Sequence, residues 1–117
     1  MNVEPSNLFQ LASRRLQWLS ERQKTVSENI ANADVSGYRA REVQDFASYL
    51  DKSREAGALP EVEVDEVESS WGEDLTGNNV VLEEQMVLAA STTGQYRMAS
   101  SLYRKAQQMI LAVASGR

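Results

Sequence analysis

Residues 29–46 read Asn-Ile-Ala-Asn-Ala-Asp-Val-Ser-Gly-Tyr-Arg-Ala-Arg-Glu-Val-Gln-Asp-Phe, and this stretch decides the fold because it separates two long amphipathic segments. Its small residues from Ala31 to Asp34 let backbones approach closely, and Asn and Asp tolerate the left-handed conformation. Gly37 reaches positive φ without a Cβ clash. The stretch therefore predicts the end of a helix and a sharp turn at Ser36-Gly37 within a turn and extended segment over 34–50.

The first amphipathic segment is predicted to form a helix over 6–33, with Ser6 as its N-terminal cap. No proline or glycine interrupts residues 6–33. Apolar residues recur there at alternating steps of three and four, which is typical of a coiled-coil seam, and polar Gln23 breaks the pattern once. The seam comprises Phe9, Ala12, Leu16, Leu19, Val26, Ile30 and Ala33.

The second segment is predicted to form a helix over 78–115, with Asn78 or Asn79 as its cap. Its apolar residues form two stripes about 60° apart, and one partner helix cannot cover both. More chains are therefore implied, and the alternative is a buried helix of a small bundle. Gly94, which costs about 1 kcal/mol inside a helix, predicts either a kink or a patch for close helix contact. The stripes are Leu82, Met86, Ala89, Tyr96, Tyr103 and Ile110, and Leu88, Ala99, Leu102, Ala106, Met109 and Val113.

The middle of the chain is strongly acidic. Residues 51–75 hold nine acidic residues against Lys52 and Arg54, in a chain whose net charge is −5. This composition predicts a solvated, irregular loop over 51–76 that offers little apolar surface, and no Asp-x-Asp-x-Asp-Gly order points to a calcium site. Glu61-Val62-Glu63-Val64 alternates with period two, which favours a short strand, and Trp71 is a candidate anchor for it.

The predicted fold class is all-α, in a single unit over 1–117. Two long terminal helices pair as an antiparallel coiled coil, and the irregular acidic middle holds the short β element.

Enzymatic chemistry is not expected. The chain has no histidine and no cysteine, so the common nucleophile–base pairs and thiolate metal sites are missing. Its six glycines are scattered among turns instead of forming a phosphate cradle. Trp18 stands among Arg14, Arg15 and Arg22, and this basic face is interpreted as an interface or solvated face instead of a nucleic-acid site. No catalytic, cofactor-binding or metal-ligating residue is assigned.

No stretch approaches the roughly 20 apolar residues of a membrane helix, and the N-terminus lacks the apolar core of a signal peptide. We expect a chain that is soluble as made. If it works outside the cytoplasm, it must be exported without a cleaved hydrophobic signal.

The stretch at 29–46 resembles the N-terminal signature of the bacterial flagellar axial proteins, the rod, hook and hook-associated group, with Val35-Ser36 where Thr-Pro is usual. Leu-Ala-Ser-Arg-x-x-x-Trp-Leu-Ser-x-Arg-Gln over residues 11–23 and Gly-Asn-Asn-Val over residues 77–80 resemble the flagellar basal-body rod protein family, especially its short proximal rod proteins. The motif and turn residues are Asn29, Ile30, Ala31, Asn32, Ala33, Asp34, Gly37, Tyr38 and Arg39.

The resemblance implies a structural, non-enzymatic subunit of the proximal rod that polymerises through its terminal helices into a torque-transmitting shaft. It implies a place in the periplasmic rod of the basal body. Implied partners are copies of the chain, other rod proteins, the rod-base adaptor at the export gate and membrane ring, and the flagellar type III export apparatus, with no cofactor, nucleic acid or small-molecule substrate. Residues expected at the assembly interface are Phe9, Leu16, Leu19, Val26, Ile30, Leu82, Met86, Tyr96, Leu102, Tyr103, Met109 and Ile110. The alternative function is a soluble coiled-coil adaptor or export chaperone that binds a partner helix.

Overall fold

A computed structural model describes residues 5–57, 59–68 and 72–116 of the chain. The molecule is elongated, with extents of 64 × 27 × 21 Å. Its elements, in chain order, are α1 (Pro5–Ala31), β1 (Arg41–Val43), α2 (Phe46–Ala56), β2 (Val64–Glu66) and α3 (Leu82–Ala114).

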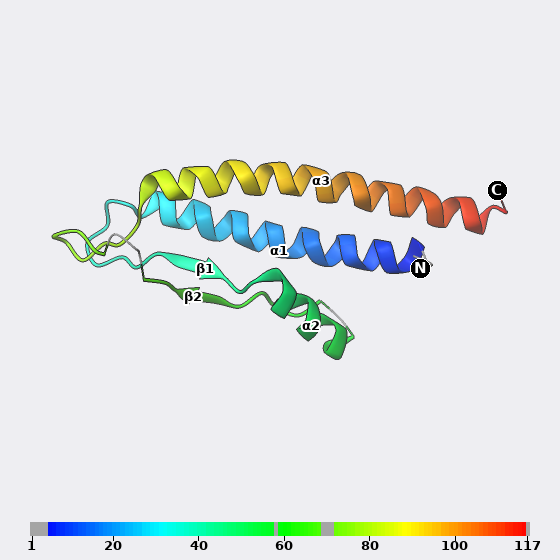
Figure 1. Cartoon of the computed structure of the whole chain (residues 1–117), viewed down its shortest axis with the longest axis horizontal. Helices are drawn as coiled ribbons and strands as arrows, with labels where there is room; N and C mark the ends of the chain where they lie inside the picture. Colours follow the sequence, from blue (N-terminus) through cyan, green and yellow to red (C-terminus); the bar gives the residue numbers. More distant parts are fainter. Residues whose placement is uncertain (1–4, 58, 69–71, 117) are drawn as a thin grey trace.

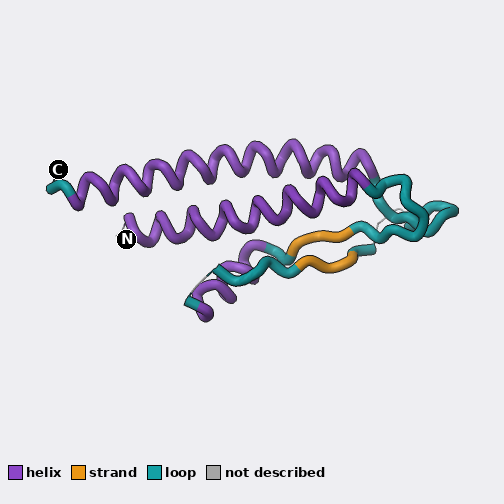
Figure 2. Tube along the Cα trace, turned by 180° about the vertical axis from the view of Figure 1, so that it is seen from behind, coloured by secondary structure: helices purple, strands orange, loops and turns teal. Residues whose placement is uncertain are grey.

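The helix α1 lies in the middle of the molecule. Helix α3 runs antiparallel along one side of it, and the β1–β2 pair with α2 lies along the other side (Figures 1 and 2). The two termini lie at the same end, where α3 extends beyond the beginning of α1, and the connecting loops lie at the opposite end (Figure 1). The two predicted terminal helices are thus confirmed as long elements that lie side by side.

The start of α3 differs from the prediction. The helix begins at Leu82, and its cap position is Val81, whose side chain makes no capping hydrogen bond. Glu83 and Glu84 in the first turn place negative charge near the positive end of the helix dipole. The expectation that Asn78 or Asn79 caps the helix is wrong because both side chains are used in the preceding loop.

Helix α2 occupies residues that the sequence predicted to be extended over 34–50 and irregular from residue 51, and that prediction is wrong over Phe46–Ala56. The Asp45 side chain accepts a hydrogen bond from the Ser48 backbone N–H at 3.2 Å, which caps the helix. Gly57 ends it at φ 65°, the left-handed position that favours glycine. The helix therefore carries ordinary start and stop signals that the acidic composition of the region obscured.

Strands β1 and β2 form a two-stranded antiparallel sheet in which Val43 pairs with Val64. The chain is therefore mostly helical with a small sheet, not all-α. A short strand in the acidic middle is confirmed, but it spans Val64–Glu66 instead of 61–64. Trp71, the predicted anchor of this strand, lies outside the described residues.

The core lies where α1 meets α3 and the segment that holds β1, α2 and β2. Its buried residues are Trp18, Leu19, Val43, Tyr49, Val62 and Ala99, with Leu16, Phe46 and Val64 packed against them. Residues of the segment 34–50, in β1 and α2, supply most of the apolar surface that covers one side of α1, and the acidic middle over 51–76 adds Val62 and Val64. The apolar seam of α1 is therefore largely covered within a single chain.

The buried row of α3 consists of small and polar residues spaced by seven: Gln85, Thr92, Ala99 and Ala106. The large residues predicted to pack on α1 are less covered, since Leu82 is 40% exposed and Met86 is 59% exposed. Helix α3 is continuous through Gly94, and a Cβ added there would meet nothing within 4 Å. Neither the predicted break nor a close helix contact occurs at Gly94 in this chain.

Candidate assembly surface and the polar junction behind it

A buried asparagine joins the end of α1 to the rest of the chain. Asn29 is 1% exposed. Its Nδ2 donates to the Arg41 carbonyl at 2.8 Å and to Gln85 Oε1 at 3.0 Å. Its Oδ1 accepts from the Tyr38 hydroxyl at 3.0 Å and from the Arg41 N–H at 3.0 Å. One side chain therefore connects α1, the chain leading into β1, and α3.

Two further asparagines complete what we call the polar junction, formed by Asn29, Tyr38, Asn78, Asn79 and Gln85. Asn78 Nδ2 donates to the carbonyls of Asn32 at 2.9 Å and Val35 at 2.8 Å, in the turn that follows α1.

Asn79 extends the junction to the sheet. Its Oδ1 accepts from the Ala40 N–H at 2.5 Å, and its Nδ2 donates to the Val67 carbonyl at 2.7 Å. Since Asn78 and Asn79 are 3% and 2% exposed, these bonds replace water that the loop groups would otherwise bind.

Burial, followed by the nearby charge of Glu28, raises the pKa of Tyr38. The phenol therefore stays protonated at neutral pH and donates to Asn29.

Asp74 organises the loop before α3, because its Oδ1 accepts from the Thr76 hydroxyl at 2.6 Å and from the Asn78 N–H at 3.0 Å. The Thr76 side-chain hydrogen bond is the main cause that lowers the pKa of Asp74.

Two glycines face each other where the loops meet. Gly37 has φ 76°, and Gly77 has φ 83°. A Cβ added at Gly77 would lie 3.6 Å from the Gly37 Cα, which is ordinary contact. The Gly37 N–H donates to the Thr76 carbonyl at 2.8 Å. The sharp turn predicted around Gly37 is thus present, and its left-handed backbone is the feature that requires glycine.

Alanine substitution should have opposite effects at Gly77 and Gly94. Gly77→Ala is expected to lower the free energy of unfolding by roughly 1–2 kcal/mol, because alanine is strained at positive φ. Gly94→Ala is expected to raise it by roughly 0.5–1 kcal/mol, since Gly94 lies in a helix with open space around it. Urea denaturation of the two variants measures both effects, and a stabilising Gly77→Ala would contradict this assignment.

The remaining motif residues are placed at the surface or half-buried. Ala31, Asp34 and Gly37 are exposed, and Ile30, Asn32, Ala33, Tyr38 and Arg39 are half-buried. Arg39 forms an ion pair with Glu73 at 2.7 Å. The sequence singled out Asn29 but missed the role of Asn78, Asn79 and Gln85, although a double asparagine after a glycine was a visible signal for side chains that bind loop backbone.

The basic face of α1 was misinterpreted at Trp18, which is a core residue and not an interface or solvated residue. Trp18 is 6% exposed, and its Nε1 donates to the Gln44 carbonyl at 2.7 Å. The guanidinium of Arg15 lies 4.8 Å from the Trp18 ring centre, and that of Arg22 lies 5.2 Å from it. Burial, followed by the charge of Arg22, lowers the pKa of Arg15, which also donates to Gln95 Oε1 at 3.0 Å.

The predicted interface residues divide into three groups by exposure. Leu19 and Val26 are buried within the chain, and Phe9 stacks on Tyr103 with ring centres 4.6 Å apart. Leu16, Ile30 and Ile110 are half-buried. The exposed members are Leu82, Met86, Tyr96, Leu102 and Met109. The exposed group lies entirely on α3 and is the most open to another molecule.

A continuous apolar side runs along the second half of α3. Met98, Leu102, Met109 and Val113 are 70%, 41%, 44% and 70% exposed. They fall within about 60° of one another around the helix axis. We call these four residues the apolar side of α3.

Beside Leu102 lies a groove of about 160 Å³, bounded by α1, α2 and α3. Leu8 and Leu11 of α1, Phe46 of α2, and Ala99 of α3 are among its lining residues. The groove extends the apolar side of α3 onto α1 and α2.

Within residues 5–57, 59–68 and 72–116, no three His, Cys, Asp or Glu side chains gather into a group suited to a metal ion. Among the helices described, none combines the length and apolar content that crossing a bilayer requires.

Comparison with known proteins agrees with these features. Residues 9–39 match the family described as Flagella basal body rod protein. The chain is 32% identical over 126 residues to the flagellar basal body rod protein FlgB of Agrobacterium fabrum strain C58, and the alignment covers 94% of each chain. It is 41% identical over 51 residues to FlgB of Proteus mirabilis strain HI4320, covering 44% of this chain and 36% of that protein. The chain belongs to the family of flagellar basal body rod proteins that includes FlgB.

Proposed function

We propose that the chain is a structural subunit of the proximal rod of the bacterial flagellar basal body, where it polymerises through its terminal helices into a torque-transmitting shaft. The observation that carries the proposal is the apolar side of α3, which one copy of the chain leaves uncovered. Exposed apolar surface of this extent is typical of an interaction site.

The energetics favour several neighbours over one. Fully burying a large apolar side chain contributes about 1.5–3 kcal/mol, and the four residues of the apolar side are already partly covered. Association costs at least about 4 kcal/mol in lost freedom, so a single small contact gives weak binding. Each subunit is therefore stable in place only when several neighbours cover it, as in a helical assembly with contacts that do not close.

The proposed partners are copies of the chain, other rod proteins, the rod-base adaptor at the export gate and membrane ring, and the flagellar type III export apparatus. The proposed location is the periplasmic rod. The absence of cysteine supports passage through an export channel as an unfolded chain, since no disulfide has to form or break. The paired terminal helices are proposed to pack as an antiparallel coiled coil inside the shaft.

Leu102→Asp is expected to abolish rod assembly while leaving the fold intact. A carboxylate buried without a partner opposes assembly strongly, whereas Leu102 is 41% exposed in the free chain. The measurement is recovery of rods in basal bodies from cells that carry only the variant, together with the thermal unfolding of the purified chain.

Leu102→Met, which keeps an apolar side chain of similar volume, is the matched control and should assemble normally. Normal rods with Leu102→Asp would refute the proposed assembly surface. A purified chain that forms a closed helical dimer with Leu102 buried would favour the soluble adaptor or export chaperone instead.

A further inference from the structure

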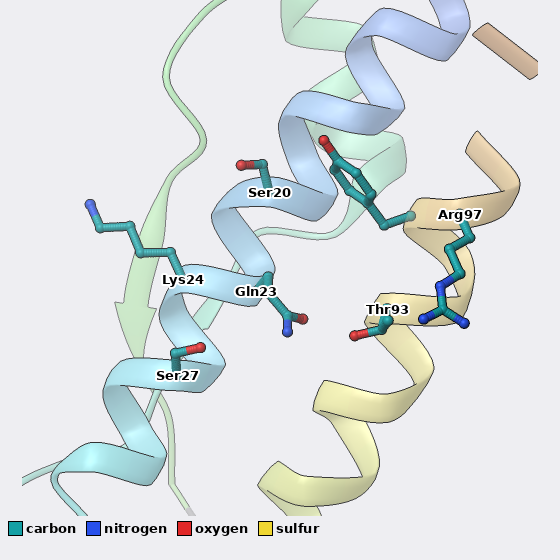
Figure 3. A pocket seen from close by; sticks show the side chains of 7 residues that line it. Ser20, Gln23, Lys24, Ser27, Thr93 and Arg97 are labelled. Carbon is teal, nitrogen blue, oxygen red and sulfur yellow. The ribbon is translucent and has the colours of Figure 1, made fainter. Parts of the chain in front are cut away.

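A second groove runs between α1 and α3, and each of its lining side chains carries a polar group, unlike those of the apolar groove beside Leu102. It has a volume of about 410 Å³ and is lined only by residues of these two helices (Figure 3). Lys24 extends from the α1 rim, and Arg97 extends from the α3 rim (Figure 3). The other lining side chains are amides and hydroxyls from Ser20, Gln23, Ser27, Thr93 and Tyr96.

The groove carries positive charge without balancing acids among its lining residues. From residue 85 to residue 116 the sequence contains Arg97, Arg104 and Lys105 but no Asp or Glu. Glu21 and Glu28 of α1 do not line the groove. Gln23 Oε1 is buried without a hydrogen-bond partner, so one polar atom of the groove wall makes no hydrogen bond within a single chain.

The complementary surface lies elsewhere on the same chain. Strand β2 and the residues after it carry Asp65, Glu66 and Glu68, all of them exposed. In the described part of the chain, ion pairs join Arg39 to Glu73, Lys52 to Glu63 and Arg54 to Asp51. None of these pairs uses the acids of 65–68, or Lys24 or Arg97.

The acidic strand cannot fill the groove of its own chain. It pairs with β1, and the sheet borders the face of α1 around Thr25 and Val26, whereas the groove takes its α1 lining from another face of that helix, around Lys24. None of the groove's lining residues belongs to the sheet or to α2. A second copy of the chain can present its strand to the groove, and the opposite charges of the two surfaces fit such a contact.

We propose that the groove of one copy binds the acidic segment 65–68 of a second copy. The contact joins two different surfaces of the same chain, so each bound copy offers a free groove or a free strand to the next, and the contact can repeat along a helical assembly. This inference rests on the proposed function and identifies one specific contact between subunits. The apolar side of α3 is a separate surface that this contact leaves open to other neighbours.

Charge reversal tests the contact. Lys24→Glu/Arg97→Glu and Asp65→Lys/Glu66→Lys should each lower rod recovery roughly tenfold or more, because like charges across an interface cost several kcal/mol. The chain that carries all four substitutions restores opposite charges and should recover assembly. The net charge of Lys24→Glu/Arg97→Glu is matched by the control Lys52→Glu/Arg54→Glu on α2, which should assemble like the unmodified chain.

The outcomes separate the two proposals. If both charge-reversed chains assemble normally while Leu102→Asp does not, the groove contact is overturned and the proposed rod function stands. If the fourfold variant fails to assemble although each of its two parent variants folds with unchanged thermal unfolding, the pairing of these surfaces is also overturned. Assembly of Leu102→Asp would refute the rod surface whatever the charge variants do.

Discussion

Trp18→Ala is expected to lower the free energy of unfolding by about 4 kcal/mol, the largest effect on stability that we predict for a single substitution. The indole is 6% exposed and packs edge-on against Phe46, with ring centres 5.7 Å apart. Its removal leaves a cavity between α1 and α2, and the Gln44 carbonyl loses the donor that now lies 2.7 Å away. Arg15 and Arg22 also lose the ring against which they pack.

Trp18→Phe is the control for this prediction. It keeps an aromatic ring but removes the N–H donor. It should therefore lower the free energy of unfolding by clearly less than Trp18→Ala, roughly 1–2 kcal/mol. Urea denaturation followed by circular dichroism measures both variants. If Trp18→Ala costs less than about 1 kcal/mol, Trp18 is not the core residue described above.

Asn29→Ala is expected to lower the free energy of unfolding by about 3 kcal/mol. The substitution removes four hydrogen bonds and leaves the Tyr38 hydroxyl, the Gln85 side chain and the Arg41 backbone groups without their partner. Each buried polar group without a partner costs about 1–3 kcal/mol, and water that enters the vacated space offsets part of the sum.

Asn32→Ala is the matched control, because Asn32 is half-buried just after the end of α1 and its side chain donates to the Glu28 carbonyl at 2.7 Å. We expect it to cost less than about 1 kcal/mol by the same denaturation assay. Equal losses for the two asparagines would mean that the polar junction does not fix the loops. Asn29 and Asn32 belong to one sequence motif. Comparing the two variants therefore shows which of the two asparagines holds the loops in place.

The sequence predicted the two long helices well because each is a long amphipathic segment without proline. It also predicted the turn around Gly37, where only the left-handed conformation fits. The apolar pattern could not reveal which face of α3 turns toward α1. The buried row of Gln85, Thr92, Ala99 and Ala106 is small or polar, and hydrophobic periodicity gives the greatest weight to large side chains.

The middle of the chain was predicted poorly for a different reason. Its nine acids suggested a solvated loop over 51–76, yet Ser53 is fully buried and Val62 is 8% exposed. A helix or strand buries one face only, so charge on the other face does not exclude a core contribution. The polar junction was missed because Asn78 and Asn79 are adjacent to the start of a helix, where a capping role is the usual expectation.

The apolar side of α3 is open in the free chain, and we predict that it is covered in the assembled rod. Since the chain has no cysteine, Met98→Cys introduces a single reactive thiol on this side, and Glu55→Cys on the exposed face of α2 provides a reference thiol. The most direct measurement is the rate of maleimide labelling of each thiol in the free chain and in isolated basal bodies. We predict that labelling at position 98 is fast in the free chain and roughly tenfold or more slower in the rod, relative to position 55. Equal relative rates in the two states, or a thiol at position 98 that is already unreactive in the free chain, would contradict the claim.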